Sequence, residues 1–409
     1  MVGRPSHPPP TREGLSAADS CTTGPAEKSR GSWAAVRSAR PAGHPLNFRT
    51  EYHGYTVSLL QDAAECGRFE FELAQSGIIL PFPHRSAWLW SRPLERLVVF
   101  GVRDSAGKAV FSFPLVMTRS RALPGHANGW VERFRPADPA GTEAGLHALT
   151  DFARSQPGLL RIHVEVFSKD YVARDATGKI ATQLGFCRRS SNRTYARTIS
   201  VDLAPDESRI FDSLHPTARR HIRALRKHGL VLRPVVDRNC ADRMSGLLHE
   251  TMSRTGGPSF KIDWENIIDL SARYPDQSRI VGVFRDDSLA PDSLLAYAWG
   301  RYHGDNADYA VAASARPADL KLPLGYAPAW DLICWARQAG ATWFDFGGIS
   351  IGNHGSTDPL GGISDFKRYF SKDMITVGEE WTFDARPVRA LLARTIGKGA
   401  AWARNLGTT

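Results

Sequence analysis

Apolar runs separated by short polar turns characterise both halves of the chain. In the first half, residues 96–118 form two apolar runs around a turn at 104–107, which is typical of a β-hairpin. In the second half, residues 279–314 form three such runs, with polar turns at 286–292 and 303–306. The pattern therefore predicts a hairpin in the first half and three consecutive antiparallel strands in the second.

Each group of strands is followed by a helical segment and one further apolar strand, over 145–166 and 325–346. In the second of these segments, apolar residues recur at the spacing of one helix face, at Ala329, Leu332, Ile333 and Ala336. Gly340 suits the position just after a helix end. We therefore expect two copies of one α/β unit.

The chain is expected to divide into four segments. Residues 1–48 are rich in Pro, Gly, Ser and Arg without an apolar period, which predicts a disordered leader, and they lack the apolar core of a signal peptide. The two α/β units are expected at 49–205 and 206–385. Residues 386–409 predict a basic amphipathic tail helix that caps the second unit.

Composition narrows the class of protein. A chain of 409 residues with 42% hydrophobic content can bury two cores, and it contains no run of ~20 apolar residues that would span a membrane. Its five cysteines are scattered and never at CxxC spacing, which argues against disulfides and structural zinc and favours the cytoplasm. The net charge of +10 favours polyanionic partners, such as nucleic acid, nucleotide phosphates or anionic membrane surfaces.

The most basic segment is the predicted helix at 215–230, HPTARRHIRALRKHGL. At 100° per residue, its cations fall within an arc of roughly 120° beside an apolar stripe, and they are Arg219, Arg220, Arg223, Arg226 and Lys227. Two interpretations remain open. The helix is either an ordinary solvated surface or a face that binds the phosphates of a nucleotide or tRNA.

The segment 343–370, WFDFGGISIGNHGSTDPLGGISDFKRYF, contains two glycine pairs followed by Phe366 and Lys367. Glycine lets a backbone approach a ligand closely, so the segment predicts a ligand site. Its GISIG run also matches the nucleophile pattern GxSxG, but His354 lies too close to Ser350 to complete the triad of that hydrolase fold. The chain has no Walker loop, no HExxH and no metal-ligand spacing of histidines, so no metal site is expected.

Three segments in order, TWFDFGGI, GGISDFKRYF and VGEEW, resemble the C-terminal signature of the Fem-type peptidoglycan aminoacyltransferases. Upstream, residues 184–203, 209–234 and 247–258 are similar to the family's strand, basic helix and following helix at the start of its second domain. The first half matches by architecture only. The resemblance implies an α/β fold of two tandem GCN5-related N-acyltransferase domains, with mixed central sheets flanked by helices.

The resemblance also implies the residues of the site. Lys367, with Phe366 beside it, would sit at the reaction centre, where a fixed cation stabilises the oxyanion formed when an amine attacks an ester or thioester. The implied substrate-binding residues are Asp345, Gly347, Gly348, Arg254, Arg219, Arg220 and Arg223.

The loop before the second predicted helix bears on the donor substrate. Members of this superfamily that use acyl-CoA carry a glycine-rich Q/R-x-x-G-x-G/A loop that cradles pyrophosphate at a helix N-terminus. The matching place here is DLKLPLGYAPA, with the single glycine Gly325. The resemblance therefore favours aminoacyl-tRNA as the donor over acyl-CoA.

Three functional hypotheses remain open. In the first, a cytoplasmic monomer without a bound cofactor transfers an aminoacyl group from aminoacyl-tRNA to an amine, carried by a nucleotide- or lipid-linked peptidoglycan precursor or by a related small acceptor. In the second, the protein is an acyl-CoA-dependent N-acetyltransferase acting on a polysaccharide, lipid or small-molecule amine. In the third, it is a non-catalytic nucleic-acid-binding protein that uses the basic helix.

Overall fold

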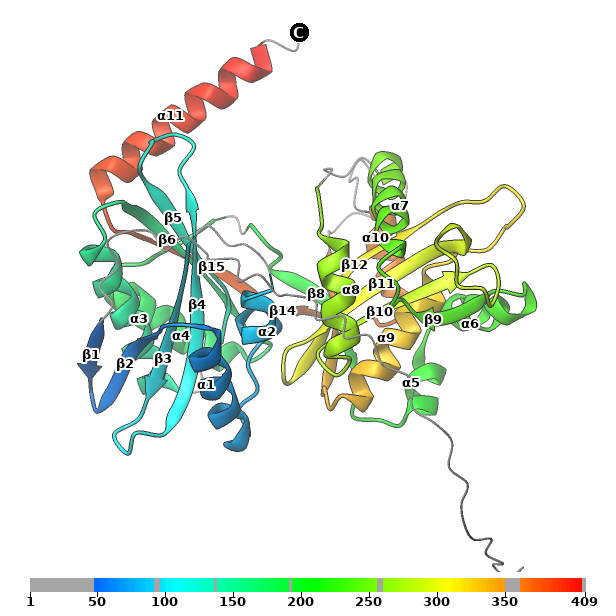
Figure 1. The fold of residues 1–409 in the computed structure, drawn as a ribbon, viewed down its shortest axis with the longest axis horizontal. Helices are drawn as coiled ribbons and strands as arrows, with labels where there is room; N and C mark the ends of the chain where they lie inside the picture. The colour runs from blue at the N-terminus through cyan, green and yellow to red at the C-terminus, as the bar shows by residue number, and fades with distance from the viewer. Residues whose placement is uncertain are drawn as a thin grey trace, which may run out of the picture. The chain divides into compact units, whose positions relative to one another are not determined.

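The computed structural model describes part of the chain, namely residues 48–91, 96–135, 138–190, 193–255, 260–349 and 361–406. The leader expected at 1–48 lies outside these residues apart from its last position. These described residues all belong to one compact unit. The described strands make two mixed sheets with helices packed against them (Figure 1).

The first sheet begins and ends with strands from distant parts of the chain. In spatial order its strands are β1 (Arg49–Tyr52), β2 (Tyr55–Leu60), β3 (Arg96–Arg103), β4 (Ala109–Arg119), β5 (Ala127–Phe134), β6 (Leu159–Phe167), β15 (Gly378–Asp384) and β7 (Cys187–Arg188). Neighbouring strands are antiparallel except β5 and β6, which are parallel and are connected through α3 (Pro139–Ser155). The Asp138 side chain caps α3 by accepting from the backbone N–H of Gly141.

Helices cover both faces of the first sheet. Successive residues of a strand point to opposite faces. Phe100 of β3 packs in one core with Phe152 of α3, whereas its neighbour Val99 packs in another with Phe69 of α1 (Ala63–Gln75). A further helix, α4 (Tyr171–Gln183), contacts α3, and the short α2 (Ser86–Leu89) contacts α1.

The second sheet repeats the arrangement of the first. In spatial order its strands are β14 (Met374–Thr376), β8 (Arg197–Asp202), β13 (Trp343–Gly348), β12 (Asn306–Ser314), β11 (Leu294–Tyr302), β10 (Ser278–Phe284) and β9 (Val231–Pro234). Its one parallel pair, β12 and β13, is connected through α9 (Tyr326–Gln338). The other helices of this half are α5 (Glu207–Ser213), α6 (Pro216–Lys227), α7 (Cys240–Thr255), α8 (Trp264–Arg273) and α10 (Gly361–Arg368).

The elements expected from the hydrophobic pattern are present. β3 and β4 form the hairpin, and Gly107 in its turn has a φ of +78°. β10, β11 and β12 form the three antiparallel strands of the second half. Gly340 follows α9 with a φ of +93°, a conformation that glycine adopts without strain. The predicted fold class, two α/β units with mixed sheets flanked by helices, is confirmed.

The two sheets exchange strands. β8 follows β7 along the chain but pairs with β13 of the second sheet, and β15 follows β14 but pairs with β6 of the first. The strands therefore do not divide at the boundary expected near residue 205. β8 precedes that boundary and belongs to the second sheet, whereas β15 lies within 206–385 and belongs to the first.

The chain crosses between the sheets twice, from β7 to β8 and from β14 to β15, and these two crossings contact one another. The backbone N–H groups of Val377 and Gly378 donate to the carbonyl oxygen of Ala196 at 2.9 and 3.3 Å. A Cβ atom on Gly378 would lie 2.4 Å from the carbonyl oxygen of Tyr195. The crossings therefore leave no room for a side chain at Gly378.

The predicted tail helix forms as α11 (Pro387–Leu406), but it packs on the first sheet rather than capping the second unit. The backbone N–H of Arg386 donates to the carbonyl oxygen of Leu160 in β6 at 3.2 Å, and Ala390 is buried. The helix then extends past the strand ends (red in Figure 1). Within the described residues, no helix combines the length and apolar character that crossing a membrane requires.

Replacing Gly378 with alanine should destabilise the protein. The added methyl group forces the Tyr195 backbone to move, and overpacking of this kind costs roughly 1–3 kcal/mol. The matched control is Gly246→Ala within α7, where a Cβ atom meets nothing within 4 Å and the stability should rise by up to ~1 kcal/mol. Urea unfolding of both variants measures the two effects, and equal stabilities would contradict the tight crossing.

Candidate functional site

Two parallel strands of the second sheet separate partway along their length. The register of β12 and β13 includes three pairs and ends with Asp308 opposite Asp345, although both strands continue. Gly347, with a φ of +71°, redirects β13 just beyond that pair. Separating strands leave backbone N–H and C=O groups on their facing edges without ladder partners, and such groups can bind the polar atoms of a ligand.

Lys367 of α10 reaches the end of β13. Its Nζ atom donates to the carbonyl oxygen of Gly348 at 2.5 Å, and the residue is only 7% exposed. Burial lowers the pKa of this ammonium to about 8, an effect that the Asp345 carboxylate partly opposes. At neutral pH Lys367 is therefore a buried cation close to its pKa.

Lys367 lies on a helix, α10, which begins with Gly361 and Gly362. Residues 350–360, which include Ser350 and His354, lie outside the described residues. Lys367 thus approaches β13 from a helix that packs on the sheet.

Asp345 is fully buried and holds the end of β13 in place. Its carboxylate accepts hydrogen bonds from the Tyr195 hydroxyl at 2.7 Å, the Thr198 hydroxyl at 2.6 Å and the backbone N–H of Gly347 at 2.8 Å. Three donors fix the orientation of this carboxylate. Gly347 and Gly348, two of the expected site residues, are therefore positioned through Asp345 and Lys367.

Arg133 of β5 connects the first sheet to this site. Its Nη2 atom lies 2.8 Å from Asp308 and 3.6 Å from Asp345, and it donates to the Tyr195 hydroxyl at 2.9 Å. The Nη2 atom of Arg301 in β11 lies 2.6 Å from the same carboxylate oxygen of Asp308. Burial opposes the charge of Arg133, but Tyr195 and the two aspartates together raise its pKa above the ordinary value. The two aspartates are thus compensated by two arginines.

Phe366 packs among aromatic rings beside Lys367. Its ring centroid lies 5.0 Å from that of Tyr326, 6.3 Å from that of Tyr309 and 6.4 Å from that of Phe346. These contacts hold α10 against β12, β13 and α9. The arrangement gives Phe366 a positioning role for Lys367.

The basic helix α6 contacts the same region. His215, at its N-cap, stacks on Tyr369 with centroids 4.7 Å apart, and His221 stacks on Tyr326 at 5.0 Å. Because Tyr326 also contacts Phe366, α6 is linked to the helix that carries Lys367.

The three expected arginines of α6 differ in their surroundings. Arg220 and Arg223 are exposed, and the Arg223 guanidinium lies 5.0 Å from the centroid of the Phe211 ring. Arg219 is partly buried and lies 3.6 Å from Asp212. Two of the three arginines therefore present their charge to solvent.

Arg254 lies at the C-terminal end of α7. Both of its Nη atoms lie 3.4 Å from the carbonyl oxygen of Ser314, the last residue of β12. Burial, together with nearby Arg316, lowers its pKa. Arg254 is thus at the far end of the part of β12 that has separated from β13.

Sequence reasoning missed Arg133, Tyr195 and Asp308. One signal could have indicated Asp308, because it interrupts the apolar strand pattern NADYAVAA as Asp345 interrupts WFDF. A buried acid requires a partner. Arg133 gives no such local signal, because its partners lie in the other half of the chain.

A resident metal has no evident ligand set. Within the part of the chain that the structure describes, no three His, Cys, Asp or Glu side chains gather closely enough to hold a metal ion.

A solved structure of FemX superimposes on this protein with a TM-score of 0.61, at 17% sequence identity, over 76% of this chain and 94% of FemX. L-PGS from Bacillus licheniformis has a TM-score of 0.41 at 14% identity, over 70% of this chain and 86% of its own. A GCN5-related N-acetyltransferase from Sphaerobacter thermophilus has a TM-score of 0.37 at 12% identity, over 83% and 98%. Neither a protein-family model nor a curated protein sequence matches the chain. The chain has the fold of FemX, which confirms the fold that the resemblance implies.

Lys367→Met should change the pH dependence of the folding stability relative to wild type. Lys367 has a pKa of about 8 when folded against 10.5 in the unfolded chain, so the unfolded chain binds more protons between these values and wild-type stability rises with pH across that window. Below pH 8 the charged side chain costs folding free energy. The variant should therefore gain stability relative to wild type at pH 7, by up to ~3 kcal/mol, and lose that gain towards pH 10.

Chemical denaturation at several pH values measures this difference. Lys372→Met, at an exposed position nearby, serves as the control and should show no such trend. A pH-independent difference between wild type and Lys367→Met would mean that Lys367 titrates normally.

Proposed function

We propose that this protein is an acyltransferase of the Fem type, which moves an aminoacyl group from aminoacyl-tRNA to an amine of a peptidoglycan precursor or a related small acceptor. The observation that carries the proposal is the buried cation of Lys367 at the point where β12 and β13 separate. The fold shared with FemX supports the same conclusion.

The chemistry follows from where the charge lies. The acceptor amine attacks the carbonyl carbon of the donor ester and forms a tetrahedral oxyanion, and expulsion of the ribose oxygen then leaves the new amide. Lys367 uses one N–H on Gly348, so its remaining N–H groups can stabilise the oxyanion. With a pKa of about 8, the same ammonium can supply a proton to the departing oxygen and recover one from the attacking amine.

The basic face of α6 supports tRNA as the donor. Arg220 and Arg223 are exposed on a helix whose rings contact those around Lys367. If the phosphodiester backbone of the tRNA bound to these arginines, its acylated end would come near β13. The Phe366 ring also lies 3.6 Å from the position of a Cβ atom on Gly325, and so covers part of the start of α9.

One observation favours a second candidate, acyl-CoA-dependent N-acyltransfer. Among the described residues, no side chain caps the N-terminus of α9, which begins after Gly325, and uncapped N–H groups at a helix start attract phosphate. Incubation of the protein and a panel of amines with charged tRNA or with labelled acetyl-CoA separates the two donors. Transfer from acetyl-CoA alone would replace the tRNA-dependent proposal, and transfer from neither would remove both.

Lys367→Met should slow the chemical step. Removing one fixed donor from a developing oxyanion typically costs ~10²–10³-fold in rate. Lys367→Arg should restore only part of the loss, because a planar guanidinium does not fit the position of a compact ammonium. Single-turnover transfer at saturating donor measures the effect, with circular dichroism as the control for folding. A wild-type rate in the methionine variant would exclude Lys367 from catalysis.

Removing two exposed arginines from α6 should weaken donor binding without changing the chemical step. The double variant Arg220→Ala/Arg223→Ala loses two phosphate contacts, so the slope of log Kd against the logarithm of the salt concentration should fall by about two. Filter binding of tRNA across a salt series measures this slope. Arg209→Ala, at an exposed position on α5, is the matched control. Unchanged affinity and slope in the double variant would leave α6 as ordinary surface.

A further inference from the structure

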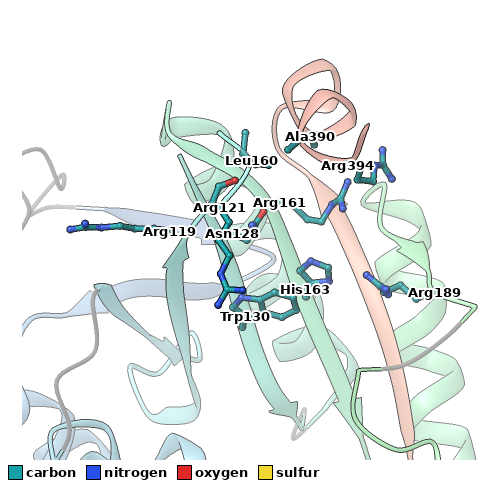
Figure 2. A pocket seen from close by; sticks show the side chains of 13 residues that line it. Arg119, Arg121, Asn128, Trp130, Leu160, Arg161, His163, Arg189, Ala390 and Arg394 are labelled. Carbon is teal, nitrogen blue, oxygen red and sulfur yellow. The ribbon is translucent and has the colours of Figure 1, made fainter. Parts of the chain in front are cut away.

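A basic pocket lies on the first sheet beside α11, in the other half of the fold from Lys367. It encloses about 410 Å³. β4, β5, β6 and α11 supply most of its wall, and it contains the side chains of Arg119, Arg121, Arg161, Arg189, Arg394, Asn128, Trp130 and His163 (Figure 2). The volume is within the range of small-ligand sites.

Five arginines line the pocket, and two carboxylates lie beside three of them. Asp384 pairs with both Arg161 and Arg394, the latter at 3.3 Å, and Glu380 lies 3.3 Å from Arg189. Arg121, a further lining residue, is exposed. Arg161 is 11% exposed, and its Nη2 atom is buried with no hydrogen-bond partner. A buried guanidinium nitrogen without a partner indicates that an acceptor belongs there.

His163 does not add to this charge. Burial and the nearby Arg189, Arg161 and Arg193 lower its pKa to about 3, so it is neutral at physiological pH. Its ring stacks on Trp130 with centroids 3.8 Å apart, and the Arg193 guanidinium covers the indole at 3.3 Å from the ring centroid. Because these groups cover one another, the stack lines the pocket without offering an open ring face to a nucleobase.

The arginines converge from different elements. In Figure 2 the side chains of Arg161, Arg189 and Arg394 gather near His163 and α11, whereas Arg119 points away from them. Guanidinium groups hold phosphate oxygens in pairs of parallel hydrogen bonds, so the converging arginines suit a phosphate group.

We propose that this pocket binds the phosphate or diphosphate group of a ligand, as a second site separate from the one at Lys367. The proposal does not depend on the function proposed above. The phosphate group is carried either by a soluble nucleotide or by a lipid headgroup. α11 supplies Ala390, Ala393 and Arg394 to the pocket and also carries the exposed apolar side chains of Val388, Leu391 and Leu392, which would suit a lipid.

Titration calorimetry of the full chain with inorganic pyrophosphate and with a nucleoside diphosphate tests the soluble source, and flotation with phosphatidylglycerol or phosphatidylcholine vesicles tests the lipid source. The variant Arg121→Gln/Arg394→Gln removes two exposed cations and leaves the buried Arg161 in place. Loss of each charge-assisted hydrogen bond should weaken binding by about tenfold or more. The control Arg68→Gln, on exposed α1 surface, should bind as wild type does.

Each outcome decides the proposal. Saturable binding of pyrophosphate or the nucleotide that the double variant loses supports a soluble ligand. Binding to phosphatidylglycerol vesicles but not to phosphatidylcholine, again lost in the double variant, supports a lipid. The proposal is overturned if no probe binds, or if the double variant and Arg68→Gln behave alike.

Discussion

The site in the second sheet depends on the ion pairs that Arg133 makes with Asp308 and Asp345. These aspartates form the last ladder pair before β12 and β13 separate, and two buried carboxylates side by side repel one another. A cation between them removes that repulsion, and a buried charge is tolerated only when it is paired and hydrogen-bonded. Because Arg133 belongs to β5, the shape of the opening in the second sheet is set by a residue of the first.

The backbone adds a second dependence between the halves. β8 and β15 each complete the sheet of the other half, and their crossings meet at Gly378, where only hydrogen fits. Tyr195, on one of these crossings, donates its hydroxyl hydrogen to Asp345, which lies beside Lys367. The basic pocket shows the converse relation, because its acids Glu380 and Asp384 lie on β15. Each site is therefore built from both halves of the sequence.

The sequence predicted what local patterns determine. Turn glycines such as Gly107 and Gly340 and the apolar period of α9 located the elements, and the motif around Lys367 indicated the site. The strand exchange could not be predicted, because the alternation in β15 fits the edge of either sheet. Arg133 could not be predicted as the partner of Asp308 for the same reason, since the two residues come together only when the sheets exchange strands. The burial of Lys367 depends on ring packing around Phe366, which no spacing rule reveals.

The exchange of β15 has a consequence for synthesis of the chain. On the ribosome, β6 is made long before β15, so one edge of β6 waits for its partner until every other described strand has been made. An unpaired strand edge readily pairs with other chains, and domains normally fold as they emerge. The N-terminal half of this protein cannot complete its sheet in that way. A nascent chain that stalls before β15 therefore presents an open edge, and β15, the last of the described strands to be made, closes the sheet that began to fold first.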